Sequence, residues 1–350
     1  MALDLTPSQQ IFNDALVTTL PNYTKEVFNN VMTATPLLKF MFDRGKKKTG
    51  TGSQIELIIA NQENQNAMWT GFGDSLPTSR NEQLVKAVYD WRVLNCTISI
   101  LHDEILINSE PSKIVSFVST MLKLQETACK NAMARAIFGK GSSGSSTVPD
   151  PMNGLQLLVA DDPTTGIVGG IDRSKAANAF WRNQSIKITG ADSTKLLDAM
   201  NKMILMVSRD AERPSAIVMD NYFYTMFKAT LQTIQRIITD KNTGNQGFRT
   251  LEFEGIPVIY DPNCPAYHCY FINDDYLFPV VLKGAEFDAL KPREAYNQLA
   301  LLYILHFVGN LVVSDPRRQG VIYQTVTQSQ LAEIEAESAR RFASDDSNKK

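Results

Sequence analysis

The chain has 350 residues, of which 43% are hydrophobic, and this is enough apolar material to bury one large core or two modest ones. The formal net charge of −2 excludes a general attraction of the whole surface to polyanions, so any contact with nucleic acid has to come from a local patch. The four cysteines are too few and too scattered for the disulfide scaffold of a small secreted protein, which favours folding in a reducing cytoplasm.

The N-terminal segment, residues 1–48, is predicted to be an arm rather than a domain. Thr6-Pro7 is a typical helix start, and Pro21 and Thr35-Pro36 break the segment into short helical pieces. The segment ends in a basic cluster formed by Arg44, Lys46, Lys47 and Lys48. These four residues form either a solvated turn or a contact with a partner or DNA, and the sequence leaves both alternatives open.

A long β-hairpin is predicted for residues 49–93. Residues 54–59 are strand-forming, and from Val85 to Val93 apolar and polar residues alternate as in a half-buried strand. Beyond Val93 the alternation changes phase, which predicts a bulge or a change of face near this residue. One leg of the hairpin is therefore expected to serve two environments.

The tip of this hairpin, residues 61–82, has no periodicity of its own, and a loop of this length inside a compact domain is typically functional or disordered. Large apolar side chains on an exposed tip are a solubility hazard for a monomer unless a neighbouring subunit covers them. The alternative is that they tuck back onto their own domain. The candidate inter-subunit contacts are the basic cluster of the arm and four residues of the tip: Trp69, Phe72, Leu76 and Arg80.

A long helix is predicted from about Glu110 to Phe138, with a length of about 40 Å at 1.5 Å per residue. Its apolar face is expected to carry Ile114, Val118, Met121, Ala128, Ala132 and Ala136. Residues 139–144 match the dinucleotide-binding pattern G-x-G-x-x-G, but that motif needs a preceding strand and here follows a helix. We interpret these residues as a flexible loop and expect no cofactor.

The C-terminal half is predicted to be a mixed α+β domain. Helices are expected from Asp192 or Ser193 to Val207 and from Asn221 to Thr239, and strands at Ala216–Met219, Leu251–Tyr260, Tyr267–Ile272, Gln298–Val313 and Val321–Val326. The most apolar run, residues 299–313, is short and interrupted by His306 and Asn310, so we expect no membrane span. The N-terminus lacks the basic start and apolar core of a secretory signal.

Candidates for catalysis are few. Neither a His-Glu-x-x-His motif nor a Gly-x-Ser-x-Gly nucleophile turn occurs, and His102-Asp103-Glu104 is interpreted as a turn and helix cap. Cys264, His268 and Cys269 could bind zinc, but no fourth ligand is evident and adjacent residues of a strand point to opposite faces. We therefore expect no catalytic residue, cofactor or metal; a cytoplasmic metal-dependent enzyme that uses this cluster is the alternative of a different class.

The most informative stretch is Gly166–Asn183, read as GIVGGIDRSKAANAFWRN, which fits no catalytic template. It resembles a signature of tailed-bacteriophage major capsid proteins, whose fold is shared with encapsulins and herpesvirus capsid floors. The signature residues are Gly169, Gly170, Asp172, Arg173, Trp181, Arg182 and Asn183. The resemblance also covers Trp69–Phe72, Ala87–Trp91, Asn153–Leu155 and Gly255–Val258.

The resemblance implies an α+β phage major capsid fold with an N-terminal arm, an extended hairpin loop, a long spine helix, a peripheral domain and an axial domain. Carried over by position, the parts are the arm at 1–48, the extended loop at 49–93 with its tip at 61–82, the peripheral domain at 94–183 and 293–327 with the spine helix at 110–138, the axial domain at 184–292, and a C-terminal tail at 328–350.

The function implied by the resemblance is that of a major capsid protein, which assembles as pentamers and hexamers into an icosahedral or prolate shell around phage double-stranded DNA. The implied partners are further copies of the chain, a portal, decoration proteins in shells that carry them, and the packaged DNA through nonspecific contacts. A separate scaffolding protein, or none, is implied because no coiled-coil-rich N-terminal extension is present. The implied locations are the virion capsid and, during assembly, the host cytoplasm. An encapsulin-like nanocompartment shell has the same fold and stays open as an alternative.

Overall fold

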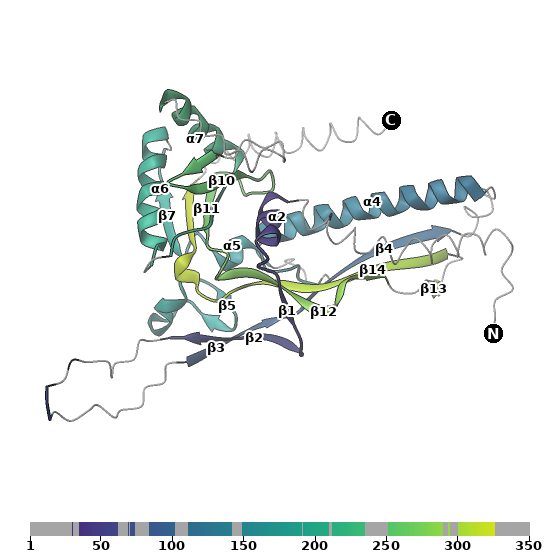
Figure 1. Ribbon diagram of the computed structural model, residues 1–350, viewed down its shortest axis with the longest axis horizontal. Helices are drawn as coiled ribbons and strands as arrows, with labels where there is room; N and C mark the ends of the chain where they lie inside the picture. Colours follow the sequence, from purple (N-terminus) through teal and green to yellow (C-terminus); the bar gives the residue numbers. More distant parts are fainter. Residues whose placement is uncertain are drawn as a thin grey trace. The chain divides into compact units, whose positions relative to one another are not determined.

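A computed structural model of the protein describes residues 30, 35–61, 69, 71–73, 84–101, 111–141, 149–190, 192–209, 212–234, 251–289, 293–294 and 300–325. The chain divides into two compact units, which are described separately (Figure 1). Unit 1 contains the described residues of Met1–Leu158, Gly166–Phe180 and Asp275–Asp315, and unit 2 contains those of Val159–Thr165, Trp181–Asp274 and Pro316–Lys350.

The main sheet of unit 1 is built around the long strand β14 (Ala300–Val313). One edge of β14 pairs with β12 (Leu277–Ala289) and β13 (Arg293–Glu294), and the other edge pairs with β4 (Arg92–Leu101), all antiparallel. The short strand β1 (Lys48–Gly50) adds to β12 in parallel. β12 was not predicted from the sequence, because Gly284 at φ +86° and two register shifts between Val281 and Asp288 interrupt its alternation.

The predicted hairpin is confirmed as the pair β2 (Gln54–Ala60) and β3 (Leu84–Asp90), in a register that runs from Gln54 opposite Asp90 to Ala60 opposite Leu84. The predicted change of environment is also confirmed. β3 ends at Asp90, and after Trp91 the chain enters β4, which belongs to the five-stranded sheet instead of the hairpin. One continuous extended segment therefore joins the hairpin to the main sheet.

The predicted long helix is confirmed as α4 (Pro111–Phe138), whose 28 residues span about 42 Å. It lies along β4, to which a disulfide between Cys96 and Cys129 ties it (Figure 1). The predicted apolar face is wrong at Ala128, which is exposed, whereas Cys129 and Ile137 are buried. The side chains of the predicted residues Ile114 and Val118 are not described. Small alanines do not define which face of a helix is buried when larger side chains lie on another face. None of the described helices is both long and apolar enough to cross a membrane.

The predicted arm ends earlier than expected. Residues 36–43 form the helix α2 (Pro36–Asp43), in which Leu37, Leu38 and Met41 are at most 2% exposed. These three side chains recur at helical spacing, so α2 buries one of its faces. Of the arm residues before α2, only Asn30 and Thr35 are described.

The described part of unit 2 contains a six-stranded mixed sheet and two α-helices of more than ten residues. The strand order is β7 (Gln184–Ile188), β15 (Gly320–Gln324), β11 (His268–Ile272), β8 (Ala216–Met219), β10 (Ile256–Tyr260) and β9 (Leu251–Phe253). The helices are α6 (Ser193–Val207), capped by Asp192 as predicted, and α7 (Asn221–Ile234). Both helices pack on this sheet in one core that includes Met200 and Phe223. The predicted end of α7, residues 235–239, lies outside the described residues.

The two units differ from the predicted domains in the placement of two strands, β12 and β15. β12, which falls within the predicted axial range 184–292, pairs with β14 in unit 1. β15, which falls within the predicted peripheral range 293–327, pairs with β7 and β11 in unit 2. The boundaries shift because strand pairing is decided by long-range packing, which the local sequence pattern does not encode.

Candidate assembly site

The signature stretch begins with a tight turn that explains its pair of glycines. β5 (Ile167–Val168) pairs antiparallel with β6 (Ile171–Asp172), so Gly169 and Gly170 are the two central residues of the turn. Their φ angles are +59° and +75°. A two-residue hairpin with positive φ at both central positions is a type I′ turn, in which glycine avoids the strain that a side chain brings.

Arg173 of the signature is a buried structural residue. Its guanidinium is fully inaccessible to solvent and donates to the carbonyls of Leu157 (3.1 Å) and Leu158 (2.6 Å) at the end of the short helix α5 (Leu155–Leu158). Burial lowers the pKa of this guanidinium to about 10, against the influence of nearby Tyr89, so Arg173 stays charged at neutral pH. Its role is to satisfy the carbonyl end of α5.

The remaining signature residues also stabilise local structure. Asp172 accepts hydrogen bonds from the amide and hydroxyl of Ser174 (2.9 and 2.8 Å), which lower the pKa of its carboxyl. In unit 2, Trp181 is fully buried, Arg182 is half-buried, and the Asn183 amide donates to Ala160 O (2.8 Å). The stretch that identifies the family by resemblance is therefore a set of fold determinants rather than a binding or catalytic site.

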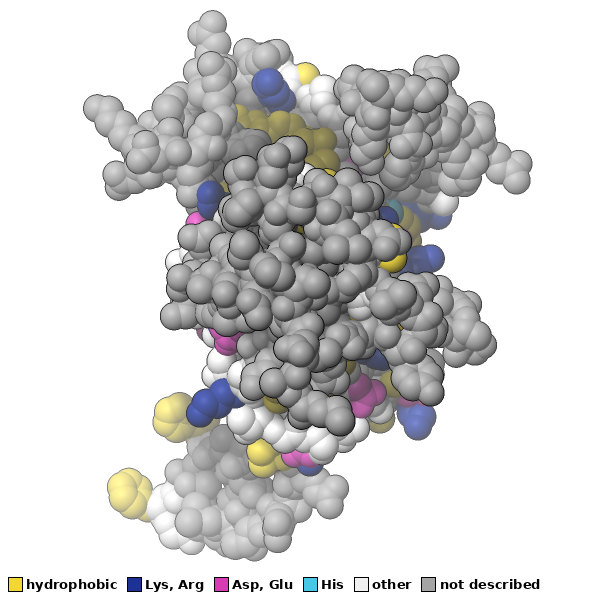
Figure 2. All heavy atoms as spheres, turned by 90° about the vertical axis from the view of Figure 1, so that its right-hand side faces the viewer, with side chains coloured by type: hydrophobic (Ala, Val, Ile, Leu, Met, Phe, Trp, Pro, Cys, Tyr) yellow, Lys and Arg dark blue, Asp and Glu magenta, His cyan; other side chains and the backbone are white. Residues whose placement is uncertain are grey.

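The hairpin of unit 1 buries one face and exposes the other. Ile55, Ala87 and Tyr89 are at most 6% exposed, whereas Ile58 is 76% and Leu84 69% exposed on the opposite face. At the tip, Trp69 and Phe72 are fully exposed, so they do not tuck back onto their own domain. Figure 2 shows hydrophobic side chains that stand out from the surface at the lower left of the view.

We call the four exposed side chains Ile58, Trp69, Phe72 and Leu84 the hairpin surface. Exposed apolar side chains are common singly, but four large ones on one projecting element are typical of an interaction site. The other two predicted tip contacts, Leu76 and Arg80, lie outside the described residues. The hairpin surface is the strongest candidate for an assembly contact among the residues that the structure describes.

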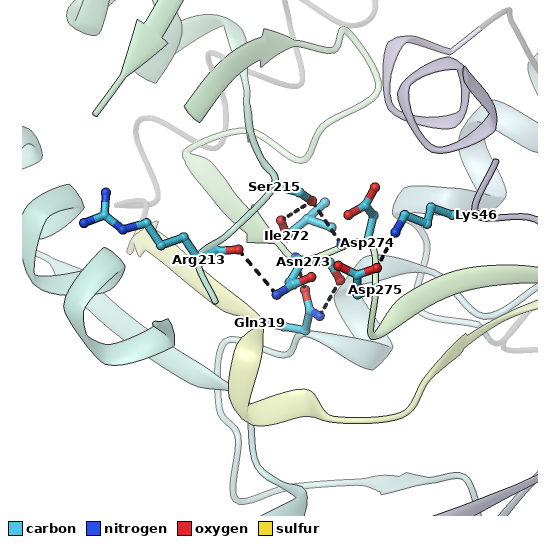
Figure 3. A network of polar contacts seen from close by, with 8 residues as sticks. All are labelled: Lys46, Arg213, Ser215, Ile272, Asn273, Asp274, Asp275 and Gln319. Atoms are coloured by element: carbon cyan, nitrogen blue, oxygen red, sulfur yellow. Dashed lines mark hydrogen bonds and ion pairs between the residues drawn. The ribbon is translucent and has the colours of Figure 1, made fainter. Parts of the chain in front are cut away.

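The predicted basic cluster has partners within unit 1. Lys46 pairs with Asp275 (Figure 3), and Lys47 pairs with Glu286 at 2.8 Å. Two further contacts involve aromatic rings: the Lys48 ammonium lies 3.6 Å from the Phe278 ring centroid, and the Arg44 guanidinium lies 5.2 Å from that of Phe40. Three of the four basic residues, Lys46, Lys47 and Lys48, therefore hold the chain against β12 or the residues just before it. No local sequence pattern indicates this role.

The Cys264, His268 and Cys269 group shows no metal-site geometry. Both ring nitrogens of His268 face protein acceptors: Nε2 lies 3.1 Å from Asp161 Oδ2 and Nδ1 lies 2.7 Å from Ala266 O. Burial raises the pKa of both thiols, which disfavours the thiolates that zinc binds. Among the residues that the structure describes, no group of three or more potential ligands is arranged to hold a metal ion.

The surroundings of His268 favour its charged form. A neutral imidazole has a single N–H, so two facing acceptors favour the imidazolium. Burial by itself lowers the pKa of His268, but the hydrogen bond and charge of Asp161, the Ala266 carbonyl and the Asp220 carboxylate outweigh it and raise the pKa above 6.5. The rings of Tyr270 and Tyr323 stack on the imidazole at 5.9 and 6.2 Å. Through its contact with Asp161, His268 ties the segment of Asp161 to the sheet of unit 2.

We predict that Asp161→Asn lowers the pKa of His268. The substitution removes the carboxylate charge that raises this pKa, whereas the burial that lowers it remains. An NMR titration of the His268 ring measures this pKa in wild type and variant. Since the folded-state pKa is raised, protonation stabilises the fold fully below pH 6.5, and this contribution is lost as the pH rises through the folded-state pKa. The control is Asp162→Asn, which removes a neighbouring carboxylate bonded to Thr164 and should leave the His268 pKa nearly unchanged. A wild-type pKa at or below 6.5 would contradict the assignment.

A second polar network in unit 2, which was not predicted, joins the residue after β11 to the residue after the short 3₁₀ helix η3 (Pro316–Arg318) (Figure 3). The Asn273 amide N–H donates to Gln319 Oε1, and Gln319 Nε2 donates to the Asn273 carbonyl, both at 2.9 Å. Both residues are at most 4% exposed, so unpaired amides there would be strongly destabilising. Isolated Asn and Gln residues carry no sequence pattern that could have revealed this pairing.

Comparison with known proteins identifies the fold. No protein-family model matches the chain, and no curated protein matches it. Among solved structures, the chain is similar to the "Cyanophage A-1(L) capsid asymmetric unit", with a TM-score of 0.54 and 14% identity over 79% of this chain and 90% of that one. It is also similar to the satellite phage P4 procapsid that includes the size determination (Sid) protein, with a TM-score of 0.50 and 13% identity over 87% of this chain and 91% of that one.

A third similar structure is the holo-SrpI encapsulin complex from Synechococcus elongatus PCC 7942, with a TM-score of 0.52 and 10% identity over 79% of this chain and 84% of that one. Identities this low show the fold alone. The predicted α+β phage major capsid fold, shared with encapsulins, is therefore confirmed.

Proposed function

We propose that the chain is a major capsid protein that self-assembles as pentamers and hexamers into an icosahedral or prolate shell around phage double-stranded DNA. The observation that carries the proposal is the fold, which the chain shares with the cyanophage and P4 capsid structures over at least 79% of its length. The protein acts in this proposal as a structural component and not as an enzyme.

The hairpin surface is the proposed inter-subunit contact. Its four side chains are large, apolar and exposed, and the extended loop at 61–82 would lie on an adjacent subunit. Burial of an exposed Phe or Leu side chain stabilises an association by about 1.5–3 kcal/mol before the ordering cost of binding. Thin shells depend on such projecting elements, because each subunit has little thickness for a compact interface. Leu76 and Arg80 complete the proposed contact.

Further partners belong to the same proposal. A separate scaffolding protein is supported by the P4 procapsid, whose described contents include a size determination protein. A portal and decoration proteins would complete the shell. Nonspecific DNA contact would involve Arg44, Lys46, Lys47 and Lys48, although the carboxylates that pair with Lys46 and Lys47 weaken their attraction for phosphate. The proposed locations are the virion capsid and, during assembly, the host cytoplasm.

The second candidate function is an encapsulin-like nanocompartment shell, which the similarity to the Synechococcus encapsulin favours. The two functions differ in what the shell encloses. Particles purified from the native source would contain nuclease-protected DNA in the first case and a co-purifying cargo protein in the second. A metal-dependent enzyme is the third alternative, and metal analysis of the purified protein tests it.

Negative-stain electron microscopy with light scattering on the purified protein tests the proposal. We expect pentamers, hexamers or closed shells, because subunits that cover a closed surface must contact copies of themselves. Both measurements should be repeated over a range of salt concentrations, since contacts between charged residues weaken as the salt concentration rises. A uniform monomer or dimer under all conditions, also when co-expressed with the neighbouring structural genes, would contradict the shell function.

A further inference from the structure

Three consecutive residues of β3, at the base of the hairpin, are held by two other parts of unit 1: the signature turn and the C-terminal end of β14. The Val88 amide donates to the carbonyl of Gly169 in the signature turn (3.0 Å). The Tyr89 hydroxyl, which is buried, donates to the carbonyl of Val313 at the end of β14 (2.8 Å). The carbonyl of Asp90 accepts from the side-chain amide of Asn310, near the C-terminal end of β14 (2.8 Å).

The signature turn also packs directly on β3. A Cβ atom added at Gly169 would lie 3.0 Å from the Tyr89 ring and 3.1 Å from the Ala87 side chain, closer than side chains normally approach. The neighbouring Gly170 has a similar positive φ, but a Cβ there would meet nothing within 4 Å. Both glycines therefore serve the turn, and Gly169 alone also makes room for the hairpin.

Asn310 connects the base of the hairpin to the segment that precedes α5. Its side-chain oxygen accepts from the Asn153 amide (2.9 Å), and Asn153 immediately precedes the turn into α5, whose final carbonyls Arg173 holds. Asn310 is 1% exposed and Asn153 7% exposed, so these bonds are shielded from water. The base of the hairpin is thus linked by hydrogen bonds to the segments that precede and follow α5. The bond between Asn153 and Asn310 is buried, and the bond between Asn310 and Asp90 is partly buried.

We propose that Gly169, Tyr89 and Asn310 are positioning residues that fix the direction in which the hairpin leaves unit 1. They set where the hairpin surface meets a second copy of the chain without touching that copy. A seven-residue strand is about 23 Å long, so a tilt of about 10° at its base would move its far end by about 4 Å, enough to misplace a contact. The consequence for shells rests on the proposed capsid function, whereas the anchoring of the hairpin does not.

The test compares Gly169→Ala with the matched control Gly170→Ala. Both variants add a Cβ at a positive φ, so both carry similar backbone strain, but only the first pushes against Tyr89 and Ala87. Hydrogen–deuterium exchange of the unassembled full chain is the first readout. We expect the peptides of β2 and β3 to exchange about tenfold faster in Gly169→Ala than in Gly170→Ala, with α6 in unit 2 unchanged in both. Equal exchange in the two variants would overturn the proposal.

Tyr89→Phe is the second variant, for the case that Gly169→Ala does not fold. It keeps the ring and removes only the hydroxyl that binds Val313 O, so faster exchange of β3 is again expected and wild-type exchange would overturn the proposal. Electron microscopy is the second readout, with aberrant or no shells expected from Gly169→Ala and normal shells from Gly170→Ala. Normal shells despite a loosened hairpin would overturn the positioning role. If the wild type itself forms no shells, the proposed capsid function is contradicted. The exchange data still test whether these residues hold the base of the hairpin.

Discussion

Trp69→Ala is expected to abolish shell formation and to leave the subunit folded. Trp69 is fully exposed in the isolated chain, so its removal takes nothing from the core and should change the free energy of unfolding by less than about 0.5 kcal/mol. In an assembled shell the same indole would be buried against a neighbour, and loss of a buried aromatic contact weakens binding by about 2 kcal/mol or more, roughly 30-fold for each interface. Light scattering and electron microscopy measure the assembly, and thermal unfolding measures the fold.

Two further variants sharpen this experiment. Trp69→Phe keeps a large aromatic side chain and should restore part of the assembly, because much of the apolar area remains. Phe72→Ala should impair assembly as Trp69→Ala does if the two exposed rings form one contact. Particles of normal yield and stability from Trp69→Ala would remove the tip from the assembly interface.

The elements that the sequence predicted best are those whose pattern is local. The helix α4 has a start signal at Pro111 and an end at the glycines after Phe138, and α6 has its capping Asp192, so the predicted and observed limits agree closely. The hairpin legs were recognisable because alternation with period two survives along β3. The strand β12 was missed, since the bulge around Gly284 destroys the same pattern.

Other features could not be read from a local pattern. The sequence gives no signal that β15 crosses into the sheet of unit 2 or that Lys46 and Lys47 bind carboxylates of residues more than 200 positions later. The candidate assembly site likewise contains residues that the local sequence predicts and residues that only the structure reveals. Trp69 and Phe72 could be selected as large apolar residues in an aperiodic loop, but Ile58 and Leu84 needed the register of the hairpin to reveal their exposed face.

The signature illustrates what a resemblance does and does not supply. It identified Gly169 and Arg173 without assigning either a role. The structure shows that Arg173 binds the carbonyl end of α5 and that Gly169 touches the hairpin, so two residues four positions apart stabilise different elements. Such roles depend on the three-dimensional neighbours of a residue, which no single sequence contains.

Gly154→Ala is expected to have the largest effect on folding. A Cβ at Gly154 would lie 2.2 Å from the carbonyl oxygen of Gly139 and 2.5 Å from that of Ala136, and both are backbone atoms at the end of α4 that cannot rotate away. The carbonyl of Gly154 also accepts hydrogen bonds from Leu157 and Leu158, so it opens α5. Moving either helix end to relieve the overlap would break these bonds, and we expect a loss of about 3 kcal/mol or more.

The control for this variant is Gly45→Ala, which introduces a side chain at φ +66° with nothing within 4 Å of its Cβ. That variant carries backbone strain of about 1 kcal/mol and no clash. Soluble yield and thermal unfolding of the two variants should therefore separate clash from strain, with Gly154→Ala failing to fold or melting far below Gly45→Ala. Equal melting temperatures would mean that α4 and α5 can move apart. Because Arg173 holds the other end of α5, a displaced α5 should also loosen the signature turn that supports the hairpin, so partly folded Gly154→Ala would show faster exchange in β3 as well.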